Sequence, residues 1–199
     1  MKRSVVLTLL LLLIASPLLA QGWEANLVHH INGWQGSFIH DYSNFISKTE
    51  PYVALGVPLV MAAVGWKNND QQLMKDALFI GTSVVGTFAF AMGLKYIVNR
   101  TRPYEAYPDL IHPHSMEPDP SFPSGHTASA FALATSLCIR YPKWYVIAPS
   151  ALWVSSVALS RMYEGVHYPT DVLGGAALGV GCTIGSYYLS KWLNKKLFD

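Results

Sequence analysis

Uncharged, strongly apolar stretches recur along the chain. Five of them follow the N-terminal region, with lengths from thirteen to nineteen residues: 51–66, 77–94, 127–139, 144–160 and 172–190. Most approach the range of about 17–25 residues that a membrane-spanning helix needs. The second and fifth stretches show no polar face at the 3.6-residue period, whereas helices of soluble proteins normally have one. The pattern predicts an all-α, membrane-embedded bundle of five to six hydrophobic helices. A soluble bundle of unusually apolar helices is the alternative.

Residues 1–20 resemble an export signal. A basic start, Lys2 and Arg3, is followed by an unbroken apolar stretch, and Ala20 lies at a position suited to signal-peptide cleavage. The seventeen uncharged residues 4–20 also just suffice to span a bilayer, so an uncleaved N-terminal anchor is the alternative. Either form sends the chain into an export route, which argues against a cytosolic protein.

Residues 21–50 have a different pattern, in which apolar side chains recur at spacings of three and four among polar residues. This amphipathic pattern includes several aromatic residues, among them Trp23, Trp34 and Phe38. It predicts amphipathic helices at the membrane interface, with their rings at the level of the headgroups. A helix that simply caps the bundle fits the pattern equally well. The remaining chain, 51–199, is expected to form the membrane domain.

The composition agrees with a membrane protein. Of the 199 residues, 51% are hydrophobic and 13% are charged, against roughly 25% charged in an ordinary soluble protein. The formal net charge is +2 and no basic run reaches five residues, so the electrostatic footprint of a nucleic-acid-binding protein is missing. Cys138 and Cys182 lie in apolar stretches, where we expect small buried side chains rather than a disulfide or a metal site.

The distribution of Lys and Arg predicts an orientation in the membrane. If the helices alternate in direction, seven basic residues fall on one side, and Lys2 and Arg3 bring this number to nine of fourteen if the N-terminal segment is retained. The other side has five: Lys48, Lys95, Arg100, Arg102 and Arg161. Cytoplasmic loops carry the excess of basic residues, so the side with nine is expected to be cytoplasmic. We therefore expect a multi-pass protein of a bacterial inner membrane, with the loops 95–126 and 161–171 in the periplasm.

Three segments on the outer side contain reactive residue types, and the first combines two cations. Lys95 and Arg102 are seven residues apart, which is two helical turns. We therefore expect both side chains on one side of the same helix end, which Pro103 terminates.

The second and third segments each precede an apolar stretch. The sequence Pro-Ser-Gly-His at 123–126 opens one stretch, and a helix start of this kind offers free N–H groups to an anion. Arg161 is followed by His167 and Asp171, and Pro169 between them suits the first turn of the last helix. Asp171 is thus expected within that first turn, with His167 just before it.

These residue types fit phosphoryl transfer. A phosphoryl group in transfer spreads negative charge over three oxygens, which Arg, Lys and backbone N–H groups can hold. A histidine attacks phosphorus when it is neutral, and a carboxylate on its other nitrogen fixes the tautomer, as Asp171 can do for His167. The leaving alkoxide then needs a proton, which His126 on the other side of the phosphate is placed to give.

Together, the three segments resemble the three-part signature of the type 2 phosphatidic acid phosphatase family, which shares its core with the vanadium-dependent haloperoxidases. The resemblance covers residues 95–171 in the family's order and implies that 51–199 is a membrane phosphatase domain. It implies that His167 becomes a phosphohistidine, that Asp171 orients it, and that His126 is the acid and then the base. The implied phosphate-binding residues are Lys95, Arg102, Ser124, Gly125 and Arg161. The resemblance implies no metal and no other cofactor.

A site between helices at the outer membrane surface suits a substrate whose tail stays in lipid. Phosphatidate, phosphatidylglycerol phosphate, undecaprenyl diphosphate and a lipid A phosphate all fit, and the bilayer is the expected partner. Alternatives are a soluble periplasmic acid phosphatase of the same family, a vanadate haloperoxidase, and a non-catalytic protein that binds lipid phosphates.

Other polar residues receive simpler interpretations. His112 and His114 are expected in a solvated loop, because no third metal ligand lies at a useful spacing. Arg100 is expected at the rim of the phosphate site or against a lipid headgroup. The proline-rich loop 104–121 contains four acidic residues and is expected to form a stiff lid over the cations.

Overall fold

The computed structural model describes residues 21–198, so the export signal or anchor expected at 1–20 lies outside the described residues. Between residues 21 and 198 there are helices and no strands. The helices are α2 (Gln21–Asn32), α3 (Ser37–Lys67), α4 (Gln71–Val98), α5 (Pro103–Ala106), α6 (Gly125–Arg140), α7 (Trp144–Tyr163) and α8 (Pro169–Phe198). The predicted all-α fold is confirmed.

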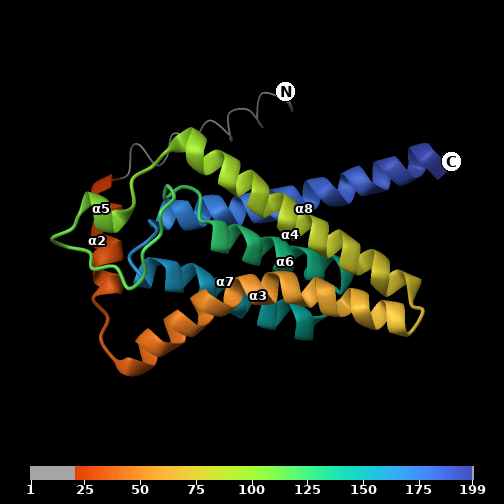
Figure 1. Cartoon of the computed structure of the whole chain (residues 1–199), viewed down its shortest axis with the longest axis horizontal. Coiled ribbons are helices and arrows are strands. Elements are labelled where there is room, and N and C mark those ends of the chain that lie inside the picture. The colour runs from red at the N-terminus through yellow and green to blue at the C-terminus, as the bar shows by residue number, and fades with distance from the viewer. Residues whose placement is uncertain (1–20, 199) are drawn as a thin grey trace.

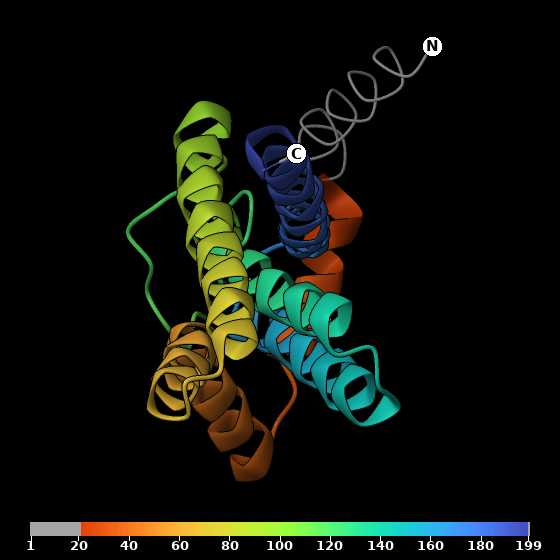
Figure 2. The same cartoon turned by 90° about the vertical axis from the view of Figure 1, so that its right-hand side faces the viewer.

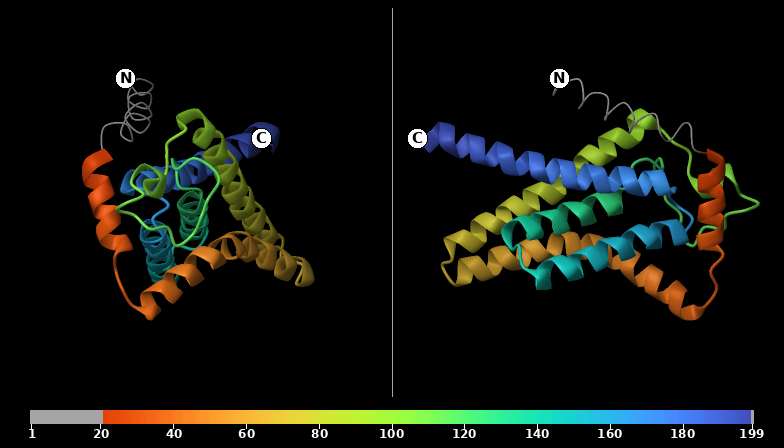
Figure 3. Two further views of the ribbon diagram at one scale, coloured as in Figure 1. Left: turned by 60° about the vertical axis from the view of Figure 1, so that its left-hand side comes forward. Right: turned by 180° about the vertical axis from the view of Figure 1, so that it is seen from behind.

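Five long helices form a bundle along the longest axis of the molecule (Figure 1). Helix α6 is central and contacts α3, α4, α7 and α8, which surround it when the bundle is viewed along its length (Figure 2). Helix α2 lies across one end of the bundle, where α5 and the long loop before α6 also lie (Figure 3). This end brings together segments that are far apart in the sequence.

Small residues let α8 approach α6 closely. The centre of α6 is built from Ala128, Ala130 and Ala132, each fully buried. On α8, a Cβ atom added to Gly175 would lie 2.5 Å from the carbonyl oxygen of Ser124, and one added to Gly179 would lie 2.5 Å from that of Ala128. Packing of this closeness between backbones is typical of helices that associate within a membrane.

Each of the five predicted apolar stretches lies inside a long helix. These helices differ in length, and only some are long enough to cross a membrane. Two helical stretches, 71–106 and 169–192, are long and apolar enough to cross a membrane. Helix α6 has 16 residues and is too short to do so at ordinary bilayer thickness. Large apolar side chains are nevertheless exposed along several helices, including Leu59, Leu78, Ile97 and Leu173.

The region 21–50 contains α2 and the first part of α3. Its apolar side chains divide between two environments, because Val28 and Ile46 are buried whereas Trp23 and Phe38 are exposed. Helix α3 runs without interruption through the boundary expected between residues 50 and 51, so no break in secondary structure marks it. The buried side chains of the first part of α3 already pack on the bundle.

Candidate active site

Helix α6 begins at the point where two of the sequence segments meet. Ser124 is its N-cap, and the Ser124 hydroxyl accepts a hydrogen bond from the Thr127 N–H at 3.4 Å. The Ser124 N–H in turn donates to the backbone carbonyl of Asp171 at 3.0 Å. This bond ties the start of α6 to the first turn of α8. A helix start within 123–126 and a helix with Pro169 in its first turn were predicted, and α6 begins at Gly125 and α8 at Pro169.

His167 and Asp171 lie side by side in the interior. His167 Nδ1 is 3.5 Å from Asp171 Oδ2, and both side chains are almost completely buried. Asp171 is held by further donors, because Oδ2 also accepts from the Tyr168 N–H at 2.8 Å and from the Ser121 hydroxyl. Within the part of the chain that the structure describes, His167 Nδ1 makes no hydrogen bond at this distance, and hydrogen bonds of catalytic groups are often long before a substrate is bound. The carboxylate is thus fixed in position to face Nδ1 of His167, and Nε2 faces the cations.

Burial and neighbouring cations keep His167 neutral. Desolvation is the largest cause and lowers the pKa of His167 well below 6.5, and the charges of Arg102, Lys95 and Arg161 lower it further. A neutral imidazole has a lone pair on one ring nitrogen. Nε2 lies 3.5 Å from Arg102 Nη1, on the side of the cations.

Three buried cations lie near the pair of His167 and Asp171. Lys95, Arg102 and Arg161 are each 2% exposed, although they come from α4, the start of α5 and α7. Arg102 donates to the carbonyl of Val166 at 2.9 Å, and Arg161 donates to Glu164 at 2.8 Å and to the Ser47 hydroxyl. Within the described chain, Arg161 Nε is a buried donor without a hydrogen-bond partner. Unused donors and buried positive charge are suited to an oxyanion.

Acidic residues of the loop before α6 lie directly on these cations. Asp119 is 3.0 Å from Lys95 Nζ and 2.7 Å from Arg102 Nη2, and Glu117 is 2.5 Å from Arg161 Nη2. Burial alone would raise the pKa of Asp119, but the charges of Lys95 and Arg102 together lower it below its usual value. The loop expected to form a lid therefore supplies two carboxylates to the three cations.

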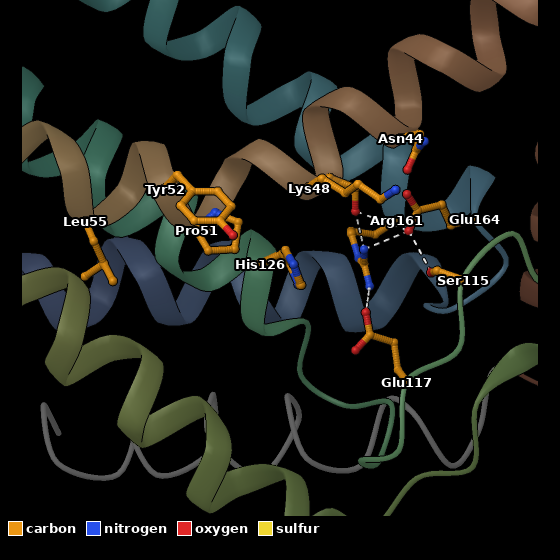
Figure 4. Close-up of a pocket in the computed structure, with 11 residues that line it drawn as sticks. Asn44, Lys48, Pro51, Tyr52, Leu55, Ser115, Glu117, His126, Arg161 and Glu164 are labelled. Atoms are coloured by element: carbon orange, nitrogen blue, oxygen red, sulfur yellow. Dashed lines mark hydrogen bonds and ion pairs between the residues drawn. The ribbon is translucent and has the colours of Figure 1, made fainter.

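His126 faces an open pocket beside the buried cluster. The pocket has a volume of about 410 Å³, and its lining includes His126 and Arg161 together with one face of α3 (Figure 4). His126 and Arg161 point toward this space from α6 and α7. His167 does not line it. His126 is thus reached from this pocket, whereas His167 lies in the buried interior.

The structure brings the sequence-predicted residues to the same end of the bundle, but the prediction that Lys95 and Arg102 share one helix was wrong. Lys95 and Arg102 were expected on one helix, but α4 ends at Val98 and Arg102 precedes α5. Asn99 adopts a left-handed conformation with φ 48°, which turns the chain at this point. The two cations meet through Asp119 instead of through helical periodicity.

Arg100 was expected at the rim of the site, and this prediction was wrong. Its guanidinium is buried and donates to Asp171 Oδ1 at 2.5 Å and to Glu24 Oε2 at 2.7 Å, and it stacks on the Tyr168 ring at 4.0 Å. Glu24, fully buried on α2, also accepts from the Thr170 N–H at 2.9 Å. A signal for Glu24 was present, because it shares the i, i+4 face of α2 with buried Val28.

The loop histidines have structural neighbours. The His112 ring is exposed while its backbone N–H and C=O bond Asn32, and the His114 ring stacks on Tyr163 with centroids 4.8 Å apart. Among residues 21–198, no three His, Cys, Asp or Glu side chains are arranged to hold a metal ion. Cys138 and Cys182 are unpaired and half-buried rather than fully buried.

Fold and site together define an all-helical protein that gathers a histidine–carboxylate pair, a second histidine and three buried cations at one end of its bundle. The chain belongs to the PAP2 superfamily, whose sequence model matches residues 76–195. The match includes all three segments of the signature.

Several curated relatives have related sequences. Undecaprenyl-diphosphatase of Sulfolobus acidocaldarius is 34% identical over 54% of this chain and 53% of its own. Lipid A 1-phosphatase of Porphyromonas gingivalis is 31% identical over 94% of this chain and 38% of its own. Undecaprenyl-diphosphatase BcrC of Bacillus subtilis is 28% identical over 65% of each chain. The chain thus spans between 38% and 65% of the lengths of these relatives.

Solved structures share the fold. The PAP2-type phosphatidylglycerolphosphate phosphatase of Bacillus subtilis superposes with a TM-score of 0.74 over 100% of both chains, at 23% identity. LpxE of Aquifex aeolicus has a TM-score of 0.69 and 24% identity, covering 85% of this chain and 97% of its own. A bacterial vanadium-dependent iodoperoxidase also shares the fold, with a TM-score of 0.68 over 85% of this chain and 49% of its own, at 19% identity.

Proposed function

We propose that this protein is a lipid phosphatase of the inner membrane that hydrolyses a lipid phosphate or diphosphate through a phosphohistidine. The observation that carries the proposal is the buried, neutral His167, which lies between the Asp171 carboxylate and the cations. A nucleophile, its orienting group and an oxyanion site are thereby present in one place. The names of the relatives, which include lipid and prenyl phosphatases, agree with this chemistry.

In the first step, Nε2 of His167 forms a bond to phosphorus while the bond from phosphorus to the leaving oxygen breaks. Asp171 holds Nδ1–H and so stabilises the charge that develops on the ring. His126 donates a proton to the leaving oxygen, which departs as an alcohol or a phosphate monoester. Lys95, Arg102 and Arg161, with the N–H groups of Ser124 and Gly125, hold the remaining phosphoryl oxygens.

In the second step, water attacks phosphorus on the side that the leaving group has vacated. His126, now neutral, takes a proton from this water, and the bond between phosphorus and Nε2 breaks. Inorganic phosphate and the free imidazole result. Three buried cations supply the positive charge that a metal ion supplies in other phosphatases, so we propose a metal-independent reaction.

A periplasmic orientation is supported by the arrangement of the helix ends. The turns between α3 and α4 and between α6 and α7 lie at the end of the bundle opposite the site, as does the C-terminus of α8 (Figure 1). These are the segments with the larger share of Lys and Arg, which favours the cytoplasm. We propose residues 21–50 as interfacial helices that cover the site end, and 51–199 as the membrane domain.

Phosphate release by purified protein in detergent tests the proposed reaction. Across phosphatidate, phosphatidylglycerol phosphate, undecaprenyl diphosphate and lipid A, we expect wild type to release phosphate from at least one substrate. We expect His167→Ala to reduce release to background, His112→Ala in the exposed loop to retain it, and EDTA to leave it unchanged. Activity that survives in His167→Ala contradicts the nucleophile, and activity lost in EDTA contradicts the metal-independent mechanism.

A further inference from the structure

The pocket at His126 changes in character along one face of α3. Its α3 lining consists of residues three or four apart in the sequence, which therefore share a helix face: Asn44, Ser47, Lys48, Pro51, Tyr52 and Leu55. The first three are polar or charged and the last three are largely apolar. From residue 44 to residue 55, eleven steps along the chain, the helix rises by about 16 Å. Figure 4 shows Lys48 between Asn44 on one side and the Tyr52 and Leu55 side chains on the other.

This pocket is the place for the leaving group, if the proposed function holds. In an in-line displacement the leaving oxygen departs on the side opposite the nucleophile. His167 is the buried nucleophile and does not line the pocket, whereas His126, the acid that protonates the leaving oxygen, does. The rest of the substrate molecule therefore extends from Arg161 and His126 along α3.

Lys48 differs from the other cations at this end of the bundle. Lys95, Arg100, Arg102 and Arg161 are buried and each has an acidic partner within 3.0 Å. Lys48 is exposed and makes no ion pair or hydrogen bond with residues 21–198. It also lines a neighbouring polar pocket of about 160 Å³ with Asn44 and His114. A free cation thus lines the same pocket as His126 and Arg161.

Glu164 is the acidic residue that lines both pockets, and its carboxylate is already paired with Arg161. Its Oε2 accepts from Arg161 at 2.8 Å, from Ser115 at 2.9 Å and from Ser47 at 3.2 Å. Glu117, the other carboxylate of the larger pocket, pairs with Arg161. The charge of Lys48 therefore stays available for an anionic ligand.

We infer that Lys48 is a specificity-determining residue that binds a second phosphate, so that the preferred substrate is a lipid diphosphate. The change from polar to apolar residues along α3 suits such a molecule. In this arrangement the phosphorus under attack lies at Arg161, Lys48 binds the phosphate that leaves with the lipid, and Tyr52 and Leu55 contact the start of the apolar chain, all four side chains lining this one pocket. His167 Nε2 bonds to the terminal phosphorus as the bond from that phosphorus to the bridging oxygen breaks, and the lipid monophosphate departs with the proton from His126. Water then cleaves the bond between phosphorus and Nε2 and releases inorganic phosphate.

Two substrates with the same chain test this inference, namely farnesyl diphosphate and farnesyl monophosphate presented to the full chain in detergent. We expect wild type to have the higher kcat/KM for the diphosphate. Lys48→Gln is expected to lower this value by about tenfold, the effect of losing one charge-assisted contact, and to change the monophosphate value by less than about twofold. Lys48→Arg is expected to keep most of the preference. Lys67→Gln, at the far end of the same helix, is the matched control and is expected to change neither value.

The outcomes separate the inference from the proposed function on which it rests. A wild-type protein that hydrolyses both substrates, with equal losses or no loss in Lys48→Gln, overturns the role of Lys48 and leaves the phosphatase intact. A wild-type protein that hydrolyses neither these substrates nor the other lipid phosphates overturns both.

Discussion

At the scale of single residues, the site depends on how buried charges are compensated. Asp171 is fully buried and faces His167, and Arg100 makes the ion pair that neutralises it. Arg100 also neutralises Glu24, so one guanidinium serves two buried carboxylates from α2 and α8. We therefore propose Arg100 as a positioning residue, which would act on the proposed reaction through Asp171.

Replacing Arg100 tests this compensation. Arg100→Gln leaves Glu24 and Asp171 as uncompensated buried carboxylates and is expected to lower the free energy of unfolding in detergent by about 3–5 kcal/mol. Adding Glu24→Gln removes one of the two unpaired charges, so the double variant is expected to regain part of this loss. Additive losses in the double variant, or an Arg100→Gln protein as stable as wild type, contradict the shared ion pair.

Where the candidate residues lie relative to the helices could largely be predicted from the sequence, because they stand at fixed spacings around helix starts. The spacing placed residues 123–126 at the start of one helix and His167 just before another, as α6 and α8 show. Arg100 was misjudged because its role depends on Glu24, a residue 76 positions earlier in the chain. Contacts over such separations are set by tertiary packing, which local spacing does not encode.

At the scale of elements, the loop between α5 and α6 lies directly on two of the cations. Asp119 contacts Lys95 and Arg102, and backbone carbonyls of the same loop also accept from these two side chains. A phosphate that binds the cations must displace the Asp119 carboxylate. The acidic composition of the loop indicated a lid, but the pairing of each carboxylate with a particular cation required the structure.

Inorganic phosphate as a competitive inhibitor reports on this displacement. Asp119→Asn removes the competing charge, so we expect phosphate to inhibit at concentrations lower by about three- to tenfold. Glu105→Gln, an exposed acidic residue of α5, is the control and is expected to leave inhibition unchanged. An inhibition constant that stays constant or rises in Asp119→Asn contradicts competition between the carboxylate and phosphate.

The contact between α6 and α8 can be tested with two glycines of the same helix. A Cβ at Gly179 would meet the Ala128 carbonyl oxygen at 2.5 Å, whereas a Cβ at Gly181 would meet no atom within 4 Å. Gly179→Ala is therefore expected to lower the free energy of unfolding by about 1–3 kcal/mol through overpacking. Gly181→Ala is expected to be neutral or to stabilise the helix by up to about 1 kcal/mol. Equal effects of the two substitutions in denaturant titrations contradict the close approach.

At the scale of the whole molecule, the arrangement gathers most of the buried charged residues at one end of an apolar bundle. The stretches without charge predicted the long helices, since length and hydrophobicity are properties of contiguous sequence. The uncharged stretches did not predict which helices are long enough to cross a membrane. Helix α6 contains such a stretch because its neighbours cover it, but it ends after 16 residues. Nor did these stretches predict that α2 lies across the site end and contributes Glu24.

The proposed reaction requires a covalent phosphohistidine at His167, and trapping this phosphoenzyme is a direct test. His126→Asn lacks the base for the water step, and p-nitrophenyl phosphate has a leaving group that departs without an acid. The His126→Asn variant is expected to accumulate as a phosphoenzyme when it is mixed with this substrate. Mass spectrometry of its peptides is expected to find one added phosphoryl group on His167. An adduct on another residue, or sustained turnover by His126→Asn without any adduct, would contradict the account.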